Sequence, residues 1–414
     1  MAKTIITCSF CGRDKRSAKM LIAGQSAHIC EVCVSEAYKI VSAESEQSQK
    51  ETAKQTLTML KPDAIKKYMD EYIIGQDQAK KVMSVAVYNH FKRISNPNHV
   101  IEKEEIEIEK SNIILVGETG TGKTLMARTI AKLLNVPFCI ADATVLTEAG
   151  YVGEDVESVL SRLLQAANFD VPSTERGIVF IDEMDKIARK GDNASITRDV
   201  SGEGVQQGLL KLLEGSIVNV PPQGGRKHPE QKMIQVNTKN ILFICGGAFD
   251  GIEKIIARRL NTQAIGFTSS VNAGEVDRGN MLQYILPQDL KTFGLIPELI
   301  GRLPITTYMS SLDAKTLRRI LTEPKNALVK QYQSLFKMDE IDLEFDEAVY
   351  DLIVGKALEY KLGARGLRGI CEAIMLDLMY EVPSQKNPPK TFTVTLDYAM
   401  QKLSKVNLGS LMAA

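Results

Sequence analysis

The sequence predicts an α/β protein with a mostly parallel sheet, a smaller α+β unit after it and a four-cysteine module before it. Three observations predict this fold. Short apolar runs alternate with helix-length amphipathic runs from residue 61 onward, the alternation changes near residue 311, and four cysteines gather before residue 40. At roughly 150 residues per domain, 414 residues suffice for about three units. The expected boundaries are 1–40 for the module, 41–60 for a flexible linker, 61–310 for the large domain and 311–414 for the small domain and tail.

The overall charge is balanced, since 51 lysines and arginines match 51 aspartates and glutamates. This balance removes the bulk field that draws basic proteins to nucleic acid or anionic lipid. The longest apolar stretch, Ile241 to Phe249, is far shorter than the ~18 residues that span a membrane, and the first residues lack the apolar core of a secretion signal. We therefore expect a cytoplasmic protein that contacts neither membrane nor nucleic acid.

The first element is the cysteine module, in which two C-x2-C pairs are separated by 18 residues. Its thiols are those of Cys8, Cys11, Cys30 and Cys33. This spacing is typical of structural zinc sites, because four thiolates close a tetrahedron around one ion. Zinc can supply on the order of 10 kcal/mol to fold so short a module. The alternative is two disulfides or a redox pair, which a reducing compartment disfavours.

The linker offers little to bury, because residues 41–56 are almost entirely polar or small. Five apolar runs after it have the length of strands buried on both faces. These runs are Asn112–Val116, Phe138–Ala141, Ile178–Ile181, Ile241–Cys245 and Pro304–Met309. Helix-length segments between them predict parallel pairing. The charged run Glu102–Lys110 is expected to be a solvated lead-in to the first strand.

The last unit has a different pattern. A helical period over Leu312–Leu335 precedes a strand-like run at Ile341–Phe345, more helix, and an alternating run at Phe392–Leu396. This order predicts a small α+β unit of about 90 residues. Three cysteines elsewhere, at positions 139, 245 and 371, stand in apolar surroundings and are expected to be buried.

A phosphate-binding loop follows the first predicted strand. Residues 117–124, GETGTGKT, match G-x-x-x-x-G-K-[ST] and open a helix over Leu125–Leu134. The glycines let backbone N–H groups converge on phosphate oxygens at the positive end of that helix. Lys123 is expected to reach the β and γ phosphates, and Thr124 to hold Mg2+. The residues expected to contact the nucleotide are Gly117, Glu118, Thr119, Gly120, Thr121, Gly122, Lys123 and Thr124.

Two carboxylates end the strand predicted at Ile178–Ile181. Asp182 is placed to contact Mg2+, directly or through water, and Glu183 to orient and polarise the attacking water. Alone, such a pair could simply open a helix. With a phosphate-binding loop upstream, it favours ATP hydrolysis.

These features together resemble an AAA+ ATPase. Four further stretches resemble the ClpX family, the protein-unfolding subunits of the Clp protease. They are Gly150–Gly153, Ser195–Gln207, Arg226–His228 and Leu295–Pro304. With the zinc module the resemblance covers essentially the whole chain. It implies a homo-hexameric ring that uses ATP to unfold tagged or unfolded substrate proteins and deliver them to the ClpP peptidase, while the zinc module recruits substrates or adaptors and dimerises.

The resemblance also implies residues that grip the substrate. Tyr151 and Val152 would stand on a loop that lines the axial pore and pushes on the polypeptide, with a second pore loop at Ser195–Ser201. Arg226, Lys227 and His228 would surround the pore entrance and attract substrate tails. The simpler alternatives are a buried turn tyrosine and a solvated surface charge.

A separate tripeptide, Ile265, Gly266 and Phe267, lies in a polar region. In the family it docks into apolar clefts of the ClpP ring, where several copies bind by avidity. The alternative is an apolar anchor clipped onto a loop core. The last residues, 411–414, are small and apolar, similar to tails that the family degrades, although a frayed terminus is the simpler interpretation.

Four more residues are implied at the nucleotide. Arg302 would reach the neighbouring subunit's site and stabilise charge on the γ-phosphate, unless it only forms an ion pair within its own chain. Arg365 resembles a sensor-2 arginine that contacts phosphate from the small domain. Ile73 and Ile74 resemble the segment that packs around adenine, with core packing as the alternative.

The sensor-1 position departs from the AAA+ pattern, because the strand at Ile241–Cys245 ends in two glycines. No residue is assigned to it. Two competing classes stay open at this point: an AAA+ chaperone that works without a peptidase, and a nucleic-acid remodeller such as a clamp loader or helicase. Zero net charge and the lack of a basic run near the zinc module argue against the second.

Overall fold

The computed structural model describes residues 7–14, 16–24, 26–40, 60–96, 100–101, 104–105, 108–147, 154–189, 202–221, 233–263, 277–360, 363–385 and 389–404. It divides into two compact units, residues 1–58 and 59–414, which we take in turn. Several predictions lie outside the described residues: the linker over 41–59, Tyr151, Val152, residues 195–201, Arg226, Lys227, His228, Ile265, Gly266, Phe267 and residues 411–414. No helix in the described ranges is long and apolar enough to cross a membrane.

The first unit is held together around its cysteines. Strands β1 (Leu21–Ala23) and β2 (His28–Cys30) pair antiparallel, with Leu21 opposite Cys30, and a helix follows over residues 31–40. The buried cluster contains only cysteines, with Ala18, Leu21 and Ile29 packed against it. Burial of these few apolar side chains cannot offset the conformational entropy lost on folding. The module therefore needs a further source of stability.

The second unit is built on a five-stranded sheet in the order β13–β5–β12–β9–β6, and every neighbouring pair is parallel. Its strands are β5 (Ile113–Val116), β6 (Phe138–Asp142), β9 (Ile178–Asp182), β12 (Leu242–Gly247) and β13 (Ile305–Tyr308). Every residue of β5 and β12 is buried, as expected for inner strands with helices on both faces. All five predicted strands are therefore confirmed, each within one or two residues of the expected bounds.

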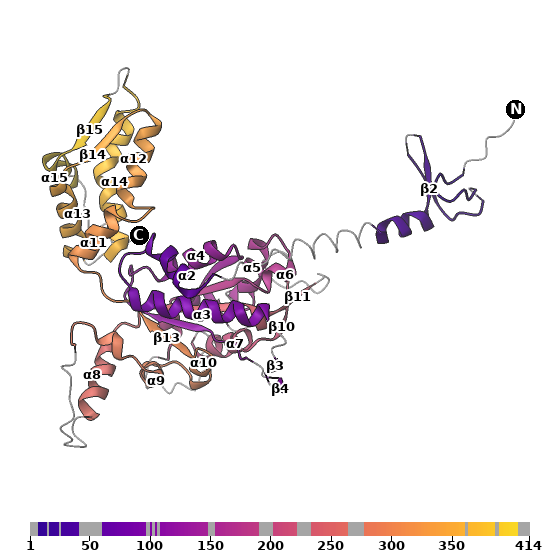
Figure 1. Ribbon diagram of the computed structural model, residues 1–414, viewed down its shortest axis with the longest axis horizontal. Helices are drawn as coiled ribbons and strands as arrows, with labels where there is room; N and C mark the ends of the chain where they lie inside the picture. Colours follow the sequence, from indigo (N-terminus) through magenta and orange to yellow (C-terminus); the bar gives the residue numbers. More distant parts are fainter. Residues whose placement is uncertain are drawn as a thin grey trace. The chain divides into compact units, whose positions relative to one another are not determined.

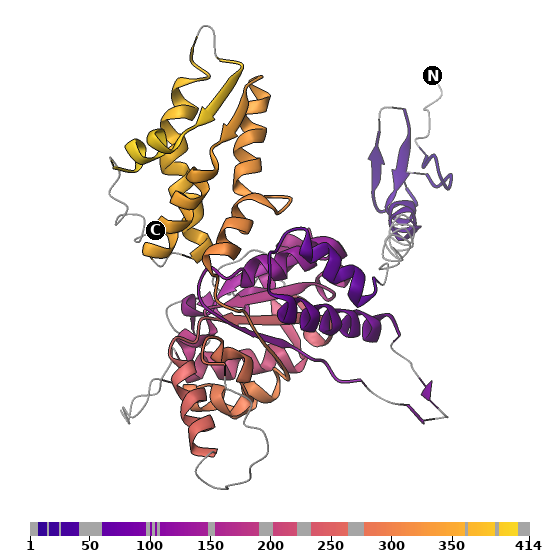
Figure 2. The same cartoon turned by 60° about the vertical axis from the view of Figure 1, so that its left-hand side comes forward.

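Helices cover both faces of this sheet (Figure 1). On one face, α5 (Ser158–Ala166), α7 (Glu203–Glu214) and α10 (Pro297–Gly301) join a large cluster with Ile181 and Phe243. On the other side of the sheet lie α2 (Pro62–Asp70) and α3 (Asp77–Ser95), in purple in Figure 2, and α4 (Lys123–Leu134), which contacts β9 and β12. Cys139, Cys245 and Cys371 are all buried in this unit, as predicted.

Shorter strands of this unit form separate two-stranded sheets. Strands β10 (Ile217–Val220) and β11 (Ile234–Asn237) form an antiparallel hairpin. Two small pairs are β3 (Val100–Ile101) with β4 (Glu104–Glu105) and β7 (Leu146–Thr147) with β8 (Glu154–Asp155). The remaining helices are α6 (Val171–Thr174), α8 (Ile252–Gln263) and α9 (Pro287–Phe293), with 3-10 turns η1 (Ala143–Val145), η2 (Met184–Ile187), η3 (Thr238–Asn240) and η4 (Met281–Tyr284).

The prediction of a solvated lead-in was wrong for Lys110. Its Nζ donates hydrogen bonds to the carbonyl oxygens of Thr238 at 3.0 Å and Leu212 at 3.4 Å, and lies 4.5 Å from the centre of the Phe243 ring. The Lys110 side chain therefore contacts other residues inside the protein, although it belongs to a charged run that predicted solvent exposure. Burial lowers the pKa of Lys110 to about 7.

The last part of the chain has its own hydrophobic cluster, from Leu317 to Leu403. Its elements, orange to yellow in Figure 2, are α11 (Ala314–Thr322), α12 (Leu328–Met338), β14 (Asp342–Phe345), α13 (Glu347–Glu359), α14 (Gly363–Glu381), β15 (Thr391–Val394) and α15 (Leu396–Ser404). Strands β14 and β15 pair in parallel. The helical period predicted over Leu312–Leu335 is confirmed as two helices, which are separate because Pro324 lacks an N–H and cannot continue α11.

Candidate nucleotide site and zinc module

The carboxyl ends of four parallel strands meet at one edge of the sheet. Strand β5 runs into the phosphate-binding loop at Gly117, and β9 ends in Asp182. Asp142, the last residue of β6, pairs with Asp182 in the strand register. The N–H of Gly117 donates to the carbonyl of Gly247 at 3.1 Å, which joins the loop to the end of β12. Ligands bind at this edge in open parallel sheets, so the fold places the predicted residues where a nucleotide would lie.

The loop's glycines have distinct reasons to be there. Gly120 and Gly122 have φ of 85° and 102°, which only glycine adopts without strain. A Cβ on Gly117 would lie 2.7 Å from the Cβ of Met309, too close for any side chain. Among the described residues no side chain caps the start of α4, so its first N–H groups remain directed toward an anion.

Lys123 is folded into this loop. Its Nζ donates to the carbonyl oxygens of Gly117 at 2.5 Å and Glu118 at 3.0 Å, and the residue is only 7% exposed. Burial lowers the pKa of Lys123, and the negative charge of Asp182 opposes that effect. A buried ammonium held only by carbonyls would gain from a phosphate oxygen, so the residue fits the predicted role.

The two predicted magnesium ligands touch. The hydroxyl of Thr124 donates to Oδ2 of Asp182 at 3.0 Å, although the two residues are 58 positions apart. A hydroxyl and a carboxylate oxygen are hard donors of the kind that Mg2+ takes beside nucleotide phosphates. The donor set therefore fits the ion, and when bound it would neutralise charge on the phosphates.

Glu183 stands beside them in an unusual backbone conformation. Its φ of 58° lies in the left-handed region, and its N–H donates to Oδ1 of Asp182 at 3.0 Å. Desolvation raises the pKa of Glu183, and the negative charges of Asp142 and Asp182 raise it further. A raised pKa makes the carboxylate a better proton acceptor, which suits the activation of water.

Asp142 and Asp185 were missed in the sequence. Asp142 raises the pKa of Glu183, and its own carboxylate accepts from the N–H of Thr144 at 2.8 Å. Asp185 is buried and accepts from the N–H of Ala248 at 3.0 Å, which ties the turn after Glu183 to the end of β12. An acid directly after a predicted strand was the signal available for Asp142.

The lack of a sensor-1 side chain has a steric cause. A Cβ on Gly246 would lie 2.6 Å from the Phe180 ring, and one on Gly247 would lie 2.6 Å from Phe249 and 2.8 Å from Asp185. Real Cβ atoms do not approach so closely. The space that a polar side chain would need is filled by two aromatic rings and a carboxylate.

The predicted adenine segment is buried and anchored. Ile73 and Ile74 are 5% and 8% exposed, and Nζ of Lys80 donates to the carbonyl of Ile73 at 2.6 Å. Gln76 forms two hydrogen bonds of 2.8 Å with the backbone N–H and C=O of Ser310, which precedes α11. The segment thus connects the nucleotide edge to the start of the last part of the chain.

Arg365 lies in α14, whose first residue, Gly363, lies beside the phosphate-binding loop. A Cβ added to Gly363 would lie 3.3 Å from the carbonyl oxygen of Thr119. The charge of Arg365 also acts on Lys123, where it adds to the lowering of the pKa caused mainly by burial. The structure therefore brings this predicted residue to the nucleotide edge.

Arg302 lies elsewhere. It follows α10 and precedes β13, whereas the phosphate-binding loop follows β5, and the parallel register sets Ile305 opposite Ile113. Arg302 and its own loop are thus at opposite ends of four-residue strands, roughly 13 Å or more apart. Its guanidinium pairs with Glu214 at 3.1 Å, as the alternative interpretation expected. Arg302 cannot serve the nucleotide of its own chain.

The cysteine module fits a zinc ion. The four Sγ atoms of Cys8, Cys11, Cys30 and Cys33 all lie within 4.8 Å of one another, and those of Cys11 and Cys30 are 3.6 Å apart. Tetrahedral zinc with bonds of about 2.3 Å requires sulfur separations of about 3.8 Å. Although burial opposes ionisation of Cys8, N–H groups around its sulfur lower its pKa to about 6. All seven cysteines are free thiols, so the disulfide alternative is not supported.

The fold and site define an ATPase of the AAA class, with ATP, Mg2+ and Zn2+ as cofactors. Residues 108–306 match the AAA domain of the Cdc48 subfamily, and residues 312–396 match the C-terminal, D2-small domain of ClpB protein. Residues 6–43 match the ClpX C4-type zinc finger. The three matches thus cover the cysteine module, most of the part built on the five-stranded sheet, and most of the last part of the chain.

Three curated relatives carry the same name, ATP-dependent Clp protease ATP-binding subunit ClpX. The protein from Bacteroides thetaiotaomicron is 62% identical over 100% of this chain and 99% of its own length. That from Bacteroides fragilis is 62% identical over 98% of each chain, and that from Porphyromonas gingivalis is 60% identical over 96% of each. The chain belongs to the ClpX family.

Proposed function

We propose that this chain is the ATP-binding subunit of a two-part Clp protease, an ATP-dependent unfoldase and translocase that passes polypeptide to the ClpP peptidase. It acts as a homo-hexamer on tagged or unfolded proteins and their adaptors, in the cytoplasm. One observation carries the hydrolytic part: Thr124, Asp182 and Glu183 converge beside the phosphate-binding loop at one sheet edge. The names of its relatives support the protease part.

In this proposal each site residue has one task. Lys123 and the loop from Gly117 to Thr124 bind the phosphates, and Asp182 with Thr124 holds Mg2+. Glu183 accepts a proton from the attacking water as that water approaches the γ-phosphate. Arg302 stabilises the developing charge in the adjacent subunit, and Arg365 senses phosphate from the last part of the chain. Ile73 and Ile74 pack against adenine.

The substrate and peptidase contacts complete the proposal. Tyr151 and Val152 grip polypeptide in the pore, Arg226–His228 select its tail, and Ile265–Phe267 dock on ClpP. We further propose the division 1–40, 41–60, 61–310 and 311–414, which agrees with separate hydrophobic clusters on either side of residue 311.

The experiment mixes the full chain, ATP and a stably folded fluorescent protein that carries an unstructured tail. Fluorescence should fall only with ATP, and the substrate should be cleaved only when ClpP is added. Glu183→Gln should retain ATP binding and lose hydrolysis by about 100-fold or more. Glu253→Gln, on the exposed side of α8, is the matched control and should behave like the parent. Near-normal turnover in Glu183→Gln, or stimulation of hydrolysis by DNA and not by protein, would contradict the proposal.

A further inference from the structure

A buried asparagine lies at the amino end of β5, directly before the strand. Asn112 is 1% exposed, and its Nδ2 donates to two carbonyl oxygens from distant parts of the chain. One belongs to Leu213, near the end of α7, at 3.2 Å, and the other to Arg302 at 2.8 Å. Within the described residues its Oδ1 has no partner, so the side chain acts here only as a donor.

Arg302 is therefore held at two points. Asn112 fixes its carbonyl, while Glu214 pairs with its guanidinium through Nε at 3.3 Å and Nη2 at 3.1 Å. Glu214 uses one edge of the planar guanidinium, and the Nη1 edge carries donors suited to a phosphate oxygen. Because Leu213 and Glu214 are neighbours, the end of α7 contacts Arg302 twice: directly through the Glu214 side chain, and through Asn112, which donates to the carbonyls of both Leu213 and Arg302.

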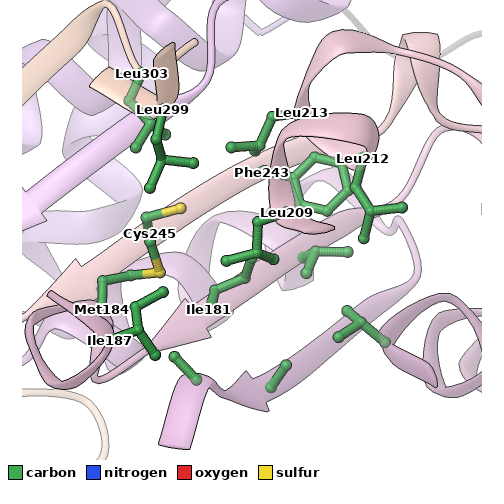
Figure 3. Packing of buried hydrophobic residues seen from close by; sticks show 14 of the residues in the cluster. Ile181, Met184, Ile187, Leu209, Leu212, Leu213, Phe243, Cys245, Leu299 and Leu303 are labelled. Carbon is green, nitrogen blue, oxygen red and sulfur yellow. The ribbon is translucent and has the colours of Figure 1, made fainter. Parts of the chain in front are cut away.

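The surroundings of this contact are rigid. Leu213 at the end of α7 and the pair Leu299 and Leu303 on either side of Arg302 belong to one buried cluster (Figure 3). They are 1%, 0% and 2% exposed. Close packing of this kind lets a displacement at one element move its neighbours rather than be absorbed.

The same asparagine leads straight into the nucleotide site. It precedes the four buried residues of β5. Gly117, the first residue of the phosphate-binding loop, follows directly after that strand. Strands β13 and β12 flank β5 along its length, so it cannot bend independently. Strand β5 thus has the phosphate-binding loop at one end and Asn112, which binds the carbonyl of Arg302, at the other.

We propose that Asn112, with Glu214, is a positioning residue that sets Arg302 for the adjacent subunit's nucleotide. The proposal rests on the role of Arg302 given above. Asn112 lies at the end of β5 opposite the phosphate-binding loop, so it acts on hydrolysis only through Arg302. Its effect must therefore appear in the neighbour's hydrolysis and not in its own.

The test mixes two partial subunits. The acceptor carries Arg302→Ala with an intact hydrolytic site, and the donor carries Glu183→Gln with an intact Arg302. Each alone should hydrolyse little ATP, and equal mixtures should regain hydrolysis wherever an acceptor's nucleotide faces a donor's arginine. Asn112→Leu, similar in size but without a donor group, is then placed in either the donor or the acceptor.

Asn112→Leu in the donor should lower the regained hydrolysis about tenfold or more, because a small misplacement of a catalytic group has a large effect. In the acceptor it should change hydrolysis less than about twofold. Glu214→Gln, on a half-exposed side chain that leaves the fold intact, should show the same asymmetry at about threefold. Thr307→Val in the donor, a buried polar substitution on β13, is the matched control and should have no effect.

Equal loss in the two mixtures, or no loss in either, would overturn the proposal, since a structural defect acts wherever it is placed. Ring assembly, followed by light scattering, shows that each mixture contains complete rings. If the unmodified mixture regains no hydrolysis, the role of Arg302 in the neighbour is itself refuted, and this inference falls with it. The two failures are therefore distinguishable.

Discussion

Glu183 shows how a single residue is prepared for its task. It occupies a left-handed backbone conformation that costs on the order of 1–3 kcal/mol for a residue with a side chain. The hydrogen bond from its N–H to Asp182 helps to hold that conformation. Strain of this kind persists where the surrounding structure fixes it, and here it stands beside the carboxylates of Asp142 and Asp182, which raise the pKa of Glu183.

We predict that Asp142→Asn moves the acid side of the ATPase pH profile to lower pH. Glu183 must be ionised to accept a proton, so kcat falls as the pH drops through its pKa. Removing the negative charge of Asp142 lowers that pKa, and the fall then occurs at lower pH. Asparagine still accepts the bond from Thr144, so the turn should stay intact.

The measurement is kcat for ATP between roughly pH 5 and 8. Asp170→Asn is the matched control, because Asp170 caps the start of α6 just as Asp142 caps η1. That control should leave the profile unchanged. An unchanged acid limb in Asp142→Asn would show that the charge does not act on the catalytic group.

At the scale of single residues, the sequence predicted the site residues that are adjacent in a motif. It missed residues that only folding brings to their partners. Lys123 and Thr124 are adjacent in a motif whose spacing encodes the phosphate geometry. Asn112 and Gln76 acquire meaning only from partners that are 101 to 234 positions away, and Asp142 from its neighbour across the strand register. No local pattern marks Asn112 or Gln76, because their roles arise from tertiary packing.

Among the elements, the zinc module depends most on something outside its own side chains. Its buried cluster holds three cysteines and a few partly buried apolar residues. The β1–β2 hairpin is only three residues a strand, which is marginal in water. Metal ligation therefore supplies most of what keeps this element folded.

We predict that removing zinc from the full chain with a strong chelator unfolds residues 7–40 and leaves basal ATP hydrolysis within about twofold. The ATPase edge has its own core, so it does not need the module. The amide signals of the module in an NMR spectrum should collapse to random-coil positions and return with Zn2+ but not with Mg2+. Dispersed module signals in the fully chelated protein would contradict this prediction.

Element boundaries show where sequence patterns lose accuracy. The five sheet strands were predictable because burial on both faces makes each a short apolar run. The β10–β11 hairpin was missed, since its strands alternate and are only four residues long. The interruption at Pro324 was missed because the apolar period continues across it, so the hydrophobic pattern alone described one helix where the backbone makes two.

For the molecule as a whole, several contacts among the described residues join the nucleotide edge to the last part of the chain. Gln76 forms two hydrogen bonds with Ser310, the Lys325 ammonium pairs with Glu71 at 2.6 Å, and the N–H of Lys325 donates to the carbonyl of Glu71 at 2.8 Å. The ion pair is exposed and contributes little, whereas Gln76 is 8% exposed and fully bonded to the backbone. Gln76 is thus a buried polar link at this junction, bonded through both ends of its side-chain amide.

We predict that Gln76→Leu raises the amount of ATP hydrolysed per substrate unfolded at least threefold. The substitution removes two hydrogen bonds of about 1 kcal/mol each, so we expect the last part of the chain to follow changes at the nucleotide edge less closely. Gln331→Leu, which removes two exposed hydrogen bonds, one to the carbonyl of Asn326 and one from Arg368, is the matched control. A ratio unchanged from the parent, measured with the fluorescent substrate, would mean that the link at Gln76 transmits no work.

The position of Arg302 at the far edge from its own phosphate-binding loop has a consequence for the life of the protein in a cell. In the role proposed for Arg302, a newly made subunit would carry its own phosphate ligands but not the cation that completes hydrolysis. It would hold ATP without consuming it until it had found its neighbours. Assembly of the ring would then be a condition for ATP use, and unassembled copies would not drain the nucleotide pool.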